Sequence, residues 1–489
     1  MKKATLKSFG VSVALCGAFC VSACSNALSG SKKAESGFDA NVVVPAQPVL
    51  TIKPAKRLWR DAADVQLAGA PPGEKVELTA TLTDNAGQVW SSRGVYYADA
   101  FGRVTPATQA SLAGTYDGVD ANGLFWSMLP VTPDALDDCA NPACLDGRPP
   151  TFAKLDATKD VKVALSARLG GASAATAGAS DLEAHQMAGF VGDNVAREVI
   201  ASGDVVGVLY YPSDVDAPPP VILVTGSDGG AYERAAALLA SHGFAALALA
   251  HFNYEGRPDS LSYIPLEYFE SALDLMTERF ERKRAALVGE SRGGEGVLLI
   301  ASYFPEKVSA VVSGVPMNIV SGGCCTPESI SQPAWTFEGE PIPPANYDIN
   351  EGQSLKDFEA SGTDFRGAVL NVAVAAHKSG VGEIPVEQIE APVLLVGGDA
   401  DEIWPSAIGV EFILKRLAAN DFSYPVDYLN ISGAGHLLAS DTPIMSLSDA
   451  SWHPFLENKI LLGGVPSINA KASKTYFDKK LEFLKKHAN

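Results

Sequence analysis

Two different hydrophobic patterns divide the chain. From Pro45 to about Leu169, apolar and polar residues alternate in short runs such as Val76–Thr83 and Val161–Leu165, with turn residues such as Asp84–Gly87 beside them. Alternation with a period of two is typical of strands that bury one face, and many short strands are typical of a β-sandwich. A β-sandwich domain is therefore expected over residues 46–170.

The pattern changes after a Gly-, Ala- and Ser-rich stretch, Gly170–Ser180. Continuous apolar runs, such as Ala245–Ala250, now alternate with helical segments expected at Tyr232–His242 and Leu261–Phe280. Apolar strands that alternate with helices indicate a mostly parallel sheet covered on both faces. We expect a linker over 171–186 and an α/β domain over 187–489.

The first residues indicate export. Lys2, Lys3 and Lys7 precede a short apolar run that is too short to span a bilayer stably. The run ends in Val21–Cys24, which resembles the lipobox of bacterial lipoproteins. This resemblance implies a signal peptide over 1–23 and a lipid on Cys24 that anchors the protein in a membrane. Cleavage nearby without lipidation is the alternative.

The segment behind Cys24 suits a tether. Residues 24–45 are rich in Ser, Ala, Gly and Lys, a composition typical of flexible linkers. By the same resemblance the protein lies in the cell envelope and faces the periplasm. Asn26 is not the aspartate associated with inner-membrane retention, so the outer membrane is favoured.

Composition excludes some classes of function. The 489 residues carry a formal net charge of −19, which disfavours nucleic acid as a partner. Export permits disulfides, but the sequence leaves the pairing of Cys139, Cys144, Cys324 and Cys325 open. These cysteines lack the ligand spacing of a zinc site, so neither a metal nor another cofactor is expected.

A nucleophile motif lies in the α/β half. Gly289–Gly293 reads G-x-S-x-G, between an apolar strand run and a helical segment. In this context the motif forms a sharp turn that presents its serine above the sheet. Ser291 is therefore the predicted nucleophile. The N–H of Arg292, at the start of the following helix, is one expected oxyanion donor. The other is expected from the Gly-rich loop after an earlier strand, at Ser227 or a neighbour up to Gly229.

The base and the acid follow in the order expected for such a serine. Asp399 and Asp401 end a strand-like run, and His436 follows a later glycine-flanked segment. Asp401 is preferred as the acid because a proline four residues later suits the loop, and Asp399 is the competing choice. His251 and His377 do not follow a late strand and are not expected to be the base.

The wider sequence resembles the acyl-CoA thioesterase / bile acid-CoA:amino acid N-acyltransferase family. The matching segments are Trp90–Ser92, Ala98–Gly102, Gly118–Met128, Ala236–Ala245, His251–Glu255, Leu266–Glu270, Gly289–Glu295, Ile384–Glu387, Asp401–Ser406 and Gly433–His436. The resemblance implies an α/β-hydrolase preceded by an immunoglobulin-like sandwich. It also supports Asp401 over Asp399, because the family's acid begins a D-x-x-W-x-S stretch.

The resemblance further implies an acyl-enzyme on the nucleophile. Family members with serine at this position are typically thioesterases, so Ser291 favours hydrolysis of an acyl ester or thioester. Two alternatives remain, an N-acyltransferase that uses an amine as acceptor and a non-catalytic binding lipoprotein. Coenzyme A thioesters are cytosolic, so export favours an ester, thioester or amide of the envelope as substrate.

Overall fold

The computed structural model describes residues 47–131, 152–170, 182–202, 205–324, 326, 328–329, 332–345, 365–453 and 458–488. The leader, the tether and Cys24 lie outside these residues, as do Cys139, Cys144 and Cys325. Within the described ranges, no helix is long and apolar enough to cross a membrane.

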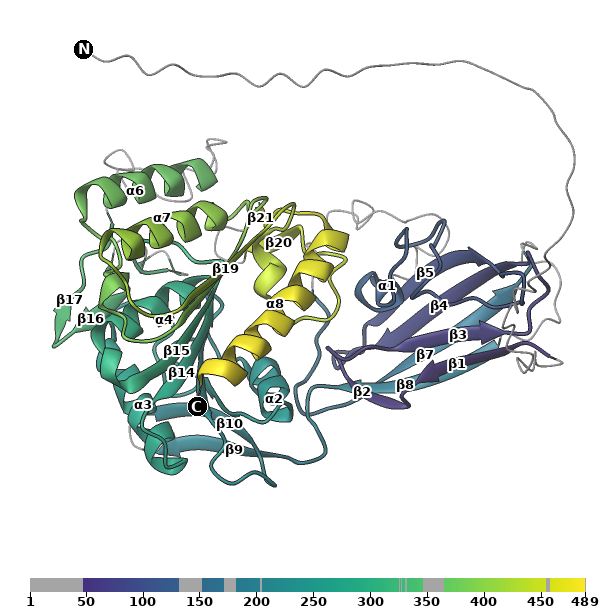
Figure 1. Cartoon of the computed structure of the whole chain (residues 1–489), viewed down its shortest axis with the longest axis horizontal. Coiled ribbons are helices and arrows are strands. Elements are labelled where there is room, and N and C mark those ends of the chain that lie inside the picture. The colour runs from purple at the N-terminus through teal and green to yellow at the C-terminus, as the bar shows by residue number, and fades with distance from the viewer. Residues whose placement is uncertain are drawn as a thin grey trace, which may run out of the picture. The chain divides into compact units, whose positions relative to one another are not determined.

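The N-terminal domain consists mainly of β-strands, as its alternating pattern predicts (Figure 1), and its longest strands have nine residues rather than being short. One sheet has the order β2-β8-β7-β4-β5-β6, and β1 pairs with β3 in a second. Val76 and Leu78 of β4 point into the core, and Leu50 and Leu67 of the second sheet share that core. The immunoglobulin-like topology stays a prediction. The elements are β1 (Val49–Lys53), β2 (Lys56–Leu58), β3 (Asp64–Ala68), β4 (Lys75–Thr83), β5 (Val89–Tyr97), α1 (Gly123–Trp126), β6 (Leu129–Pro130), β7 (Val161–Leu169) and β8 (Leu182–Gly189).

The expected linker needs a correction at its end. Strand β8 pairs antiparallel with β7 along most of its length, so it completes the N-terminal sheet. Residues 182–186 therefore belong to that sheet rather than to the predicted linker 171–186. The α/β domain begins with β9 (Val195–Ser202) rather than at residue 187.

The α/β domain is an eight-stranded sheet of order β19-β18-β15-β14-β11-β12-β10-β9. Six strands are parallel, and β9 and β10 form an antiparallel hairpin at one edge. The predicted α/β-hydrolase architecture is confirmed. The strands after β9 are β10 (Val205–Pro212), β11 (Pro220–Val224), β12 (Ala245–Leu249), β14 (Ala285–Glu290), β15 (Val308–Gly314), β18 (Val393–Gly398) and β19 (Val426–Ile431).

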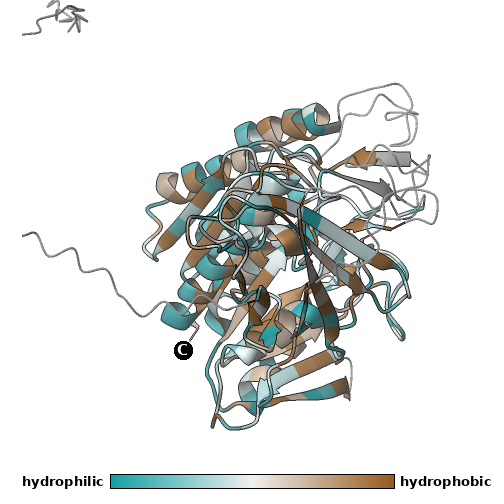
Figure 2. Cartoon of the chain, turned by 90° about the vertical axis from the view of Figure 1, so that its right-hand side faces the viewer, coloured by the Kyte–Doolittle hydropathy of each residue, from teal (hydrophilic) through white to brown (hydrophobic). Residues whose placement is uncertain are grey.

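Helices cover both faces of this sheet (Figure 1). Strand residues alternate between the two sides: Val221 and Leu223 face α2 and α8, whereas Ile222 and Val224 face α3, α4 and α7. Hydrophobic and hydrophilic residues also alternate along the helices (Figure 2), as expected when each helix buries one side. The helices are α2 (Glu233–Ser241), α3 (Leu266–Arg279), α4 (Arg292–Tyr303), α6 (Phe365–Ser379), α7 (Ser406–Ala419) and α8 (Pro466–His487).

Predicted helix boundaries agree at α2 but not at α3. The helix expected from Leu261 begins instead at Leu266, because β13 (Ile264–Pro265) precedes it and pairs with β16 (Trp335–Phe337). Strand β17 (Glu340–Pro341) extends this small sheet, and β20 (Ala450–His453) pairs with β21 (Asn458–Leu461) near the chain's end.

Candidate active site

The predicted nucleophile lies on a sharp turn between β14 and α4. Ser291 has φ 58° and ψ −123°, a backbone conformation that residues other than glycine rarely adopt. The turn also packs tightly against the sheet: a Cβ on Gly293 would lie 2.2 Å from the carbonyl oxygen of Val224, and one on Gly289 would lie 2.1 Å from that of Gly293. The glycines on both sides of Ser291 are therefore required sterically.

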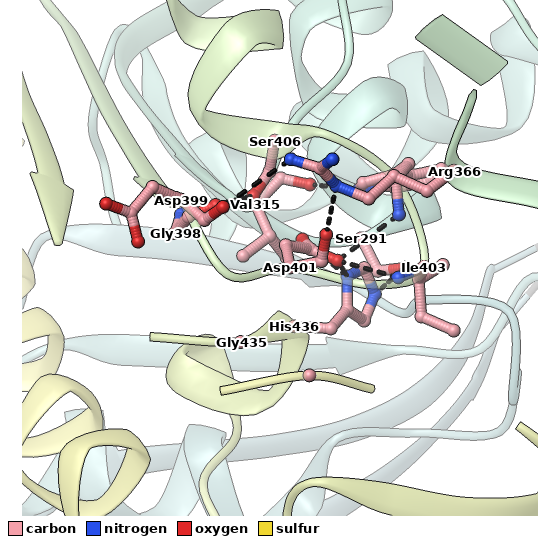
Figure 3. Close-up of polar contacts among 12 residues, drawn as sticks. Ser291, Val315, Arg366, Gly398, Asp399, Asp401, Ile403, Ser406, Gly435 and His436 are labelled. Carbon is pink, nitrogen blue, oxygen red and sulfur yellow. Dashed lines mark hydrogen bonds and ion pairs between the residues drawn. The ribbon is translucent and has the colours of Figure 1, made fainter. Parts of the chain in front are cut away.

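The structure brings the three predicted catalytic side chains together (Figure 3). The Nε2 atom of His436 lies 2.9 Å from the Oγ of Ser291. The Nδ1 atom lies 2.9 and 3.1 Å from the two carboxylate oxygens of Asp401. Since an ionised carboxylate only accepts hydrogen bonds, it holds the proton on Nδ1 and leaves Nε2 free to accept the serine proton. The arrangement can activate Ser291 as a nucleophile.

The two competing acids have different partners. Asp401 is fully buried, and its Oδ1 also accepts the N–H groups of Ile403 and Trp404 at 3.0 and 3.2 Å. Asp399 is exposed, and its carboxylate accepts the hydroxyl of Ser432 at 2.9 Å and the N–H of Gly433 at 2.6 Å. Asp401 therefore contacts the histidine, whereas Asp399 fixes the loop that leads to it.

The histidine loop is held from several directions. The backbone N–H of His436 donates to Leu462 O at 2.8 Å, and that of Gly435 donates to the side chain of Asn469 on α8 at 2.8 Å. The indole ring of Trp404 packs edge-on against the imidazole at 5.5 Å, and its Nε1 donates to Val315 O. The imidazole thus has little freedom to leave the line between Ser291 and Asp401.

The side chain of Arg292 is buried beneath the nucleophile turn. It forms an ion pair with Glu295 at 3.3 Å and donates to the carbonyl oxygen of Gly322 at 2.8 Å. The other oxygen of Glu295 accepts the N–H of Ser321 and the indole N–H of Trp335. The backbone N–H of Arg292 takes no part in this side-chain network and, at the first residue of α4, lies where an oxyanion donor is expected.

The loop of Ser227 runs beside the nucleophile turn. A Cβ on Gly226 would lie 3.3 Å from the carbonyl oxygen of Glu290, next to Ser291. The loop is braced by Tyr232, whose hydroxyl accepts the N–H of Gly226 and donates to Asp228, each at 2.8 Å. Ser227 therefore lies at the same edge of the sheet as Ser291, and its role as an oxyanion donor stays a prediction.

A cluster of charged groups lies behind the nucleophile. The carboxylate of Glu290 is 3.4 Å from the ammonium of Lys480, and burial raises the pKa of Glu290 to about 7 although Lys480 opposes that shift. Burial has the opposite effect on the pKa of Lys480, which it lowers, because in both groups it disfavours the charged form. The residue before the nucleophile is thus a carboxyl group whose charge changes near neutral pH.

The two histidines considered as alternative bases, His377 and His251, are not positioned for that role. His377 pairs with Glu383 at 2.7 Å and stacks on Phe412. His251 is fully buried against aromatic rings, and burial lowers its pKa to about 3, so it stays neutral.

Two arginines near the site carry no sequence signal. Arg366 on α6 donates to the carbonyl oxygens of Asp401 at 2.7 Å and Asp399 at 3.5 Å (Figure 3). Arg60, from the N-terminal domain, donates to Ser440 O four residues after His436. Neither arginine belongs to a sequence motif. Each contact forms only because elements that are distant along the chain pack together.

No group of three or more His, Cys, Asp or Glu side chains within the described ranges is arranged to hold a metal ion. Cys324 forms a disulfide.

Comparisons with known proteins find similarity along most of the chain. The family model "BAAT / Acyl-CoA thioester hydrolase C terminal" matches residues 264–489, and "Acyl-CoA thioester hydrolase/BAAT N-terminal region" matches residues 61–169. Acyl-coenzyme A thioesterase 1 of Homo sapiens is 28% identical over 90% of this chain and 96% of its own. Acyl-coenzyme A thioesterase 2, mitochondrial, of Homo sapiens is 28% identical over 91% of this chain and 86% of its own. Acyl-coenzyme A amino acid N-acyltransferase 1 of Mus musculus is 27% identical over 90% and 97%.

Proposed function

Because the chain belongs to the acyl-CoA thioester hydrolase / BAAT family, we propose that it is a serine acyl hydrolase that forms an acyl-enzyme on Ser291 and releases the acyl group to water. One observation carries the proposal: the hydrogen-bonded chain from Ser291 through His436 to the buried Asp401. This geometry supports the proposal because a serine nucleophile needs a base beside it and an acid that orients the base.

The proposed reaction has two stages. In the first, the Oγ of Ser291 attacks the acyl carbonyl while Nε2 of His436 takes its proton, and Asp401 stabilises the imidazolium. The N–H groups of Arg292 and Ser227 would hold the oxyanion. The acyl–leaving-group bond then breaks, and His436 returns the proton to the leaving alcohol or thiol. In the second stage His436 activates a water molecule, which releases the acid and restores Ser291.

The substrate class and location form part of the same proposal. We place the protein in the cell envelope, anchored through a lipid on Cys24 and facing the periplasm, with the outer membrane favoured. The basic leader and the lipobox-like Val21–Cys24 support this location, and so does the disulfide at Cys324, since disulfides persist in oxidising compartments. There the substrate would be a small acyl ester or thioester.

The mouse N-acyltransferase relative supports a second candidate, transfer of the acyl group to an amine. The same acyl-enzyme would serve, with an amine in place of water in the second stage. A binding lipoprotein without activity is opposed by the intact geometry of the three side chains.

The test uses the soluble form that starts after Cys24, beside Ser291→Ala. Hydrolysis of a panel of p-nitrophenyl esters and acyl-CoA thioesters is measured with and without glycine. We expect kcat to fall by roughly a thousandfold or more in the variant, and the ranking of the panel to choose between ester and thioester. Acylglycine formed faster than free acid would favour the transferase, and equal rates in both proteins would refute the proposal.

A further inference from the structure

The segment that follows the catalytic histidine is joined to the N-terminal domain at three points. Arg60 donates to the carbonyl oxygen of Ser440. Further on, the N–H of Met445 donates to Trp126 O at 2.9 Å, and the hydroxyl of Ser446 donates to Met128 O. All three partners lie in the N-terminal domain, outside the α/β sheet that carries Ser291. Residues 440–446, here called the post-histidine segment, therefore bridge the two domains.

Arg60 makes the contact that lies nearest to His436 along the chain. Its Nη2 donates to Ser440 O at 2.6 Å and to the Oγ of Ser473 on α8 at 3.0 Å. The hydroxyl of Ser473 in turn donates to Ser440 O at 2.7 Å. One carbonyl oxygen thus accepts two donors, one from the N-terminal domain and one from α8. The three groups form a closed set around the start of the post-histidine segment.

The environment of Arg60 favours a fixed guanidinium. Burial lowers the pKa of Arg60, and the acidic groups of Asp441 and Glu290 oppose that shift. Its Nε is buried and has no hydrogen-bond partner among the described residues, so the contacts that fix the guanidinium are those of Nη2. The guanidinium also lies over the ring of Phe477, 5.7 Å from the centroid. A charged donor held by several groups in a partly desolvated place binds more firmly than an exposed surface pair. Arg60 is therefore suited to fix the position of a backbone carbonyl.

The carbonyl group of Ser440 is linked to the imidazole of His436 through one short helix. The 3-10 helix η4 (His436–Ala439) begins with the catalytic histidine, and Ser440 is its C-terminal cap, with its N–H bonded to Leu437 O at 3.0 Å. The front of η4 is held by Asn469 and Leu462, as described above. The back is held at Ser440 and by the two-pronged contact of Arg234 with Asp441, at 3.1 and 3.2 Å. A shift of Ser440 would tilt η4 and move Nε2 away from Ser291.

We propose that Arg60 is a positioning residue, through which the N-terminal domain holds η4 and keeps His436 aligned with Ser291. The proposal rests on the proposed function, because alignment matters only if these two residues react. It gives the N-terminal domain a part in the chemistry without contact with substrate.

The experiment compares Arg60→Gln, Arg60→Lys and the parent in the full soluble chain, well below their unfolding temperatures. Three quantities are measured: kcat and KM on the best substrate of the panel, and the rate at which a fluorophosphonate probe labels Ser291. We expect Arg60→Gln to lower kcat and the labelling rate by about ten- to a hundredfold with KM unchanged, since small misplacements of reacting groups have effects of this order. Arg60→Lys, which keeps one charged donor for Ser440 O, should recover most of the loss.

A matched control separates alignment from general stability. Asp84 is a buried carboxylate of the N-terminal domain that accepts the indole N–H of Trp90 and the N–H groups of Gln88 and Lys154. Asp84→Ala should lower the unfolding temperature yet leave kcat and labelling unchanged. If it lowers kcat as much as Arg60→Gln does, the positioning role is overturned.

Further outcomes decide the remaining cases. If Arg60→Gln does not fold, Ser473→Ala removes the hydroxyl between Arg60 and Ser440, and it should lower kcat in the same direction with KM unchanged. Parental kcat and labelling in the folded Arg60 or Ser473 variants would overturn the inference. Labelling that depends on Ser291 in the parent tests the proposed function separately, so the two failures are distinguishable.

Discussion

The exchange of Asp401 for asparagine gives the sharpest test of the hydrogen-bonded chain. In the present arrangement the carboxylate receives Nδ1–H of His436 and the N–H groups of Ile403 and Trp404. If the new amide keeps its oxygen on the two backbone N–H groups, its NH₂ faces Nδ1 and forces the imidazole proton onto Nε2. If the amide is reversed, its NH₂ opposes the two backbone donors. The first orientation removes the base that accepts the Ser291 proton, and the second breaks the hydrogen bonds of the acid loop.

The expected magnitude follows from this tautomer argument. Asp401→Asn should lower kcat by about 10⁴, which corresponds to roughly 5 kcal/mol of transition-state stabilisation. The free energy of unfolding should fall by only about 1.5–3 kcal/mol, the contribution of one hydrogen bond to a charged group. The protein should therefore stay folded at about 25 °C while it loses activity.

Asp399→Asn is the matched control, two residues away on the same loop. It weakens the contacts with Ser432 and Gly433 and leaves Asp401 in place. We expect a loss of about 1 kcal/mol in the free energy of unfolding and a much smaller change in kcat. Steady-state hydrolysis, fluorophosphonate labelling and thermal unfolding are measured for both variants. If Asp399→Asn loses more activity than Asp401→Asn, the assignment of the acid is wrong.

Two further predictions concern the surroundings of the nucleophile. Gly293→Ala would place a Cβ 2.2 Å from Val224 O and 2.7 Å from Thr225 O, so α4 must shift; thermal unfolding should show a loss of at least about 1–3 kcal/mol, and parental stability would contradict the packing argument. Glu290→Gln should change how stability depends on pH. The folded pKa of Glu290 is about 7 and its ordinary value is 4.5, so the folded state keeps a proton that the unfolded state releases, and Glu290 makes stability fall as pH rises through this window. The unfolding temperature of the glutamine variant relative to the parent should therefore rise between about pH 5 and pH 8, and a constant difference would refute this.

Local patterns predicted the elements that carry the site, because each leaves its own trace in the sequence. The buried run before Ser291 becomes β14, and the run before Asp401 becomes β18, so the parallel sheet brings their carboxyl ends to one edge. The order of serine, acid and histidine along the chain then indicates Ser291, His436 and one of two aspartates. The choice of Asp401 over Asp399 needed the spacing of the acid loop, and the contact with His436 agrees with it.

What the sequence could not predict depends on tertiary contacts. The Gly- and Ala-rich stretch before β8 (Leu182–Gly189) predicts a linker that includes the first half of this strand, whereas its strand form is stabilised by pairing with β7. The start of α3 is set by Ile264 and Pro265, which pair with a strand far along the chain. Arg60 and Arg366 donate to backbone carbonyl oxygens, which every residue has. The type of the accepting residue therefore gives no sign of the contact in the sequence.

The support of the histidine loop by α8 has a consequence for the order of events during synthesis. Asn469 and Ser473 emerge from the ribosome after Ser291, Asp401 and His436. A nascent chain that ends before α8 can contain all three reactive side chains, yet the loop that aligns the imidazole lacks two of its supports. Activity should therefore appear only after α8 has been translated. Until then, an incomplete chain contains the reactive groups but cannot hydrolyse esters of the cell.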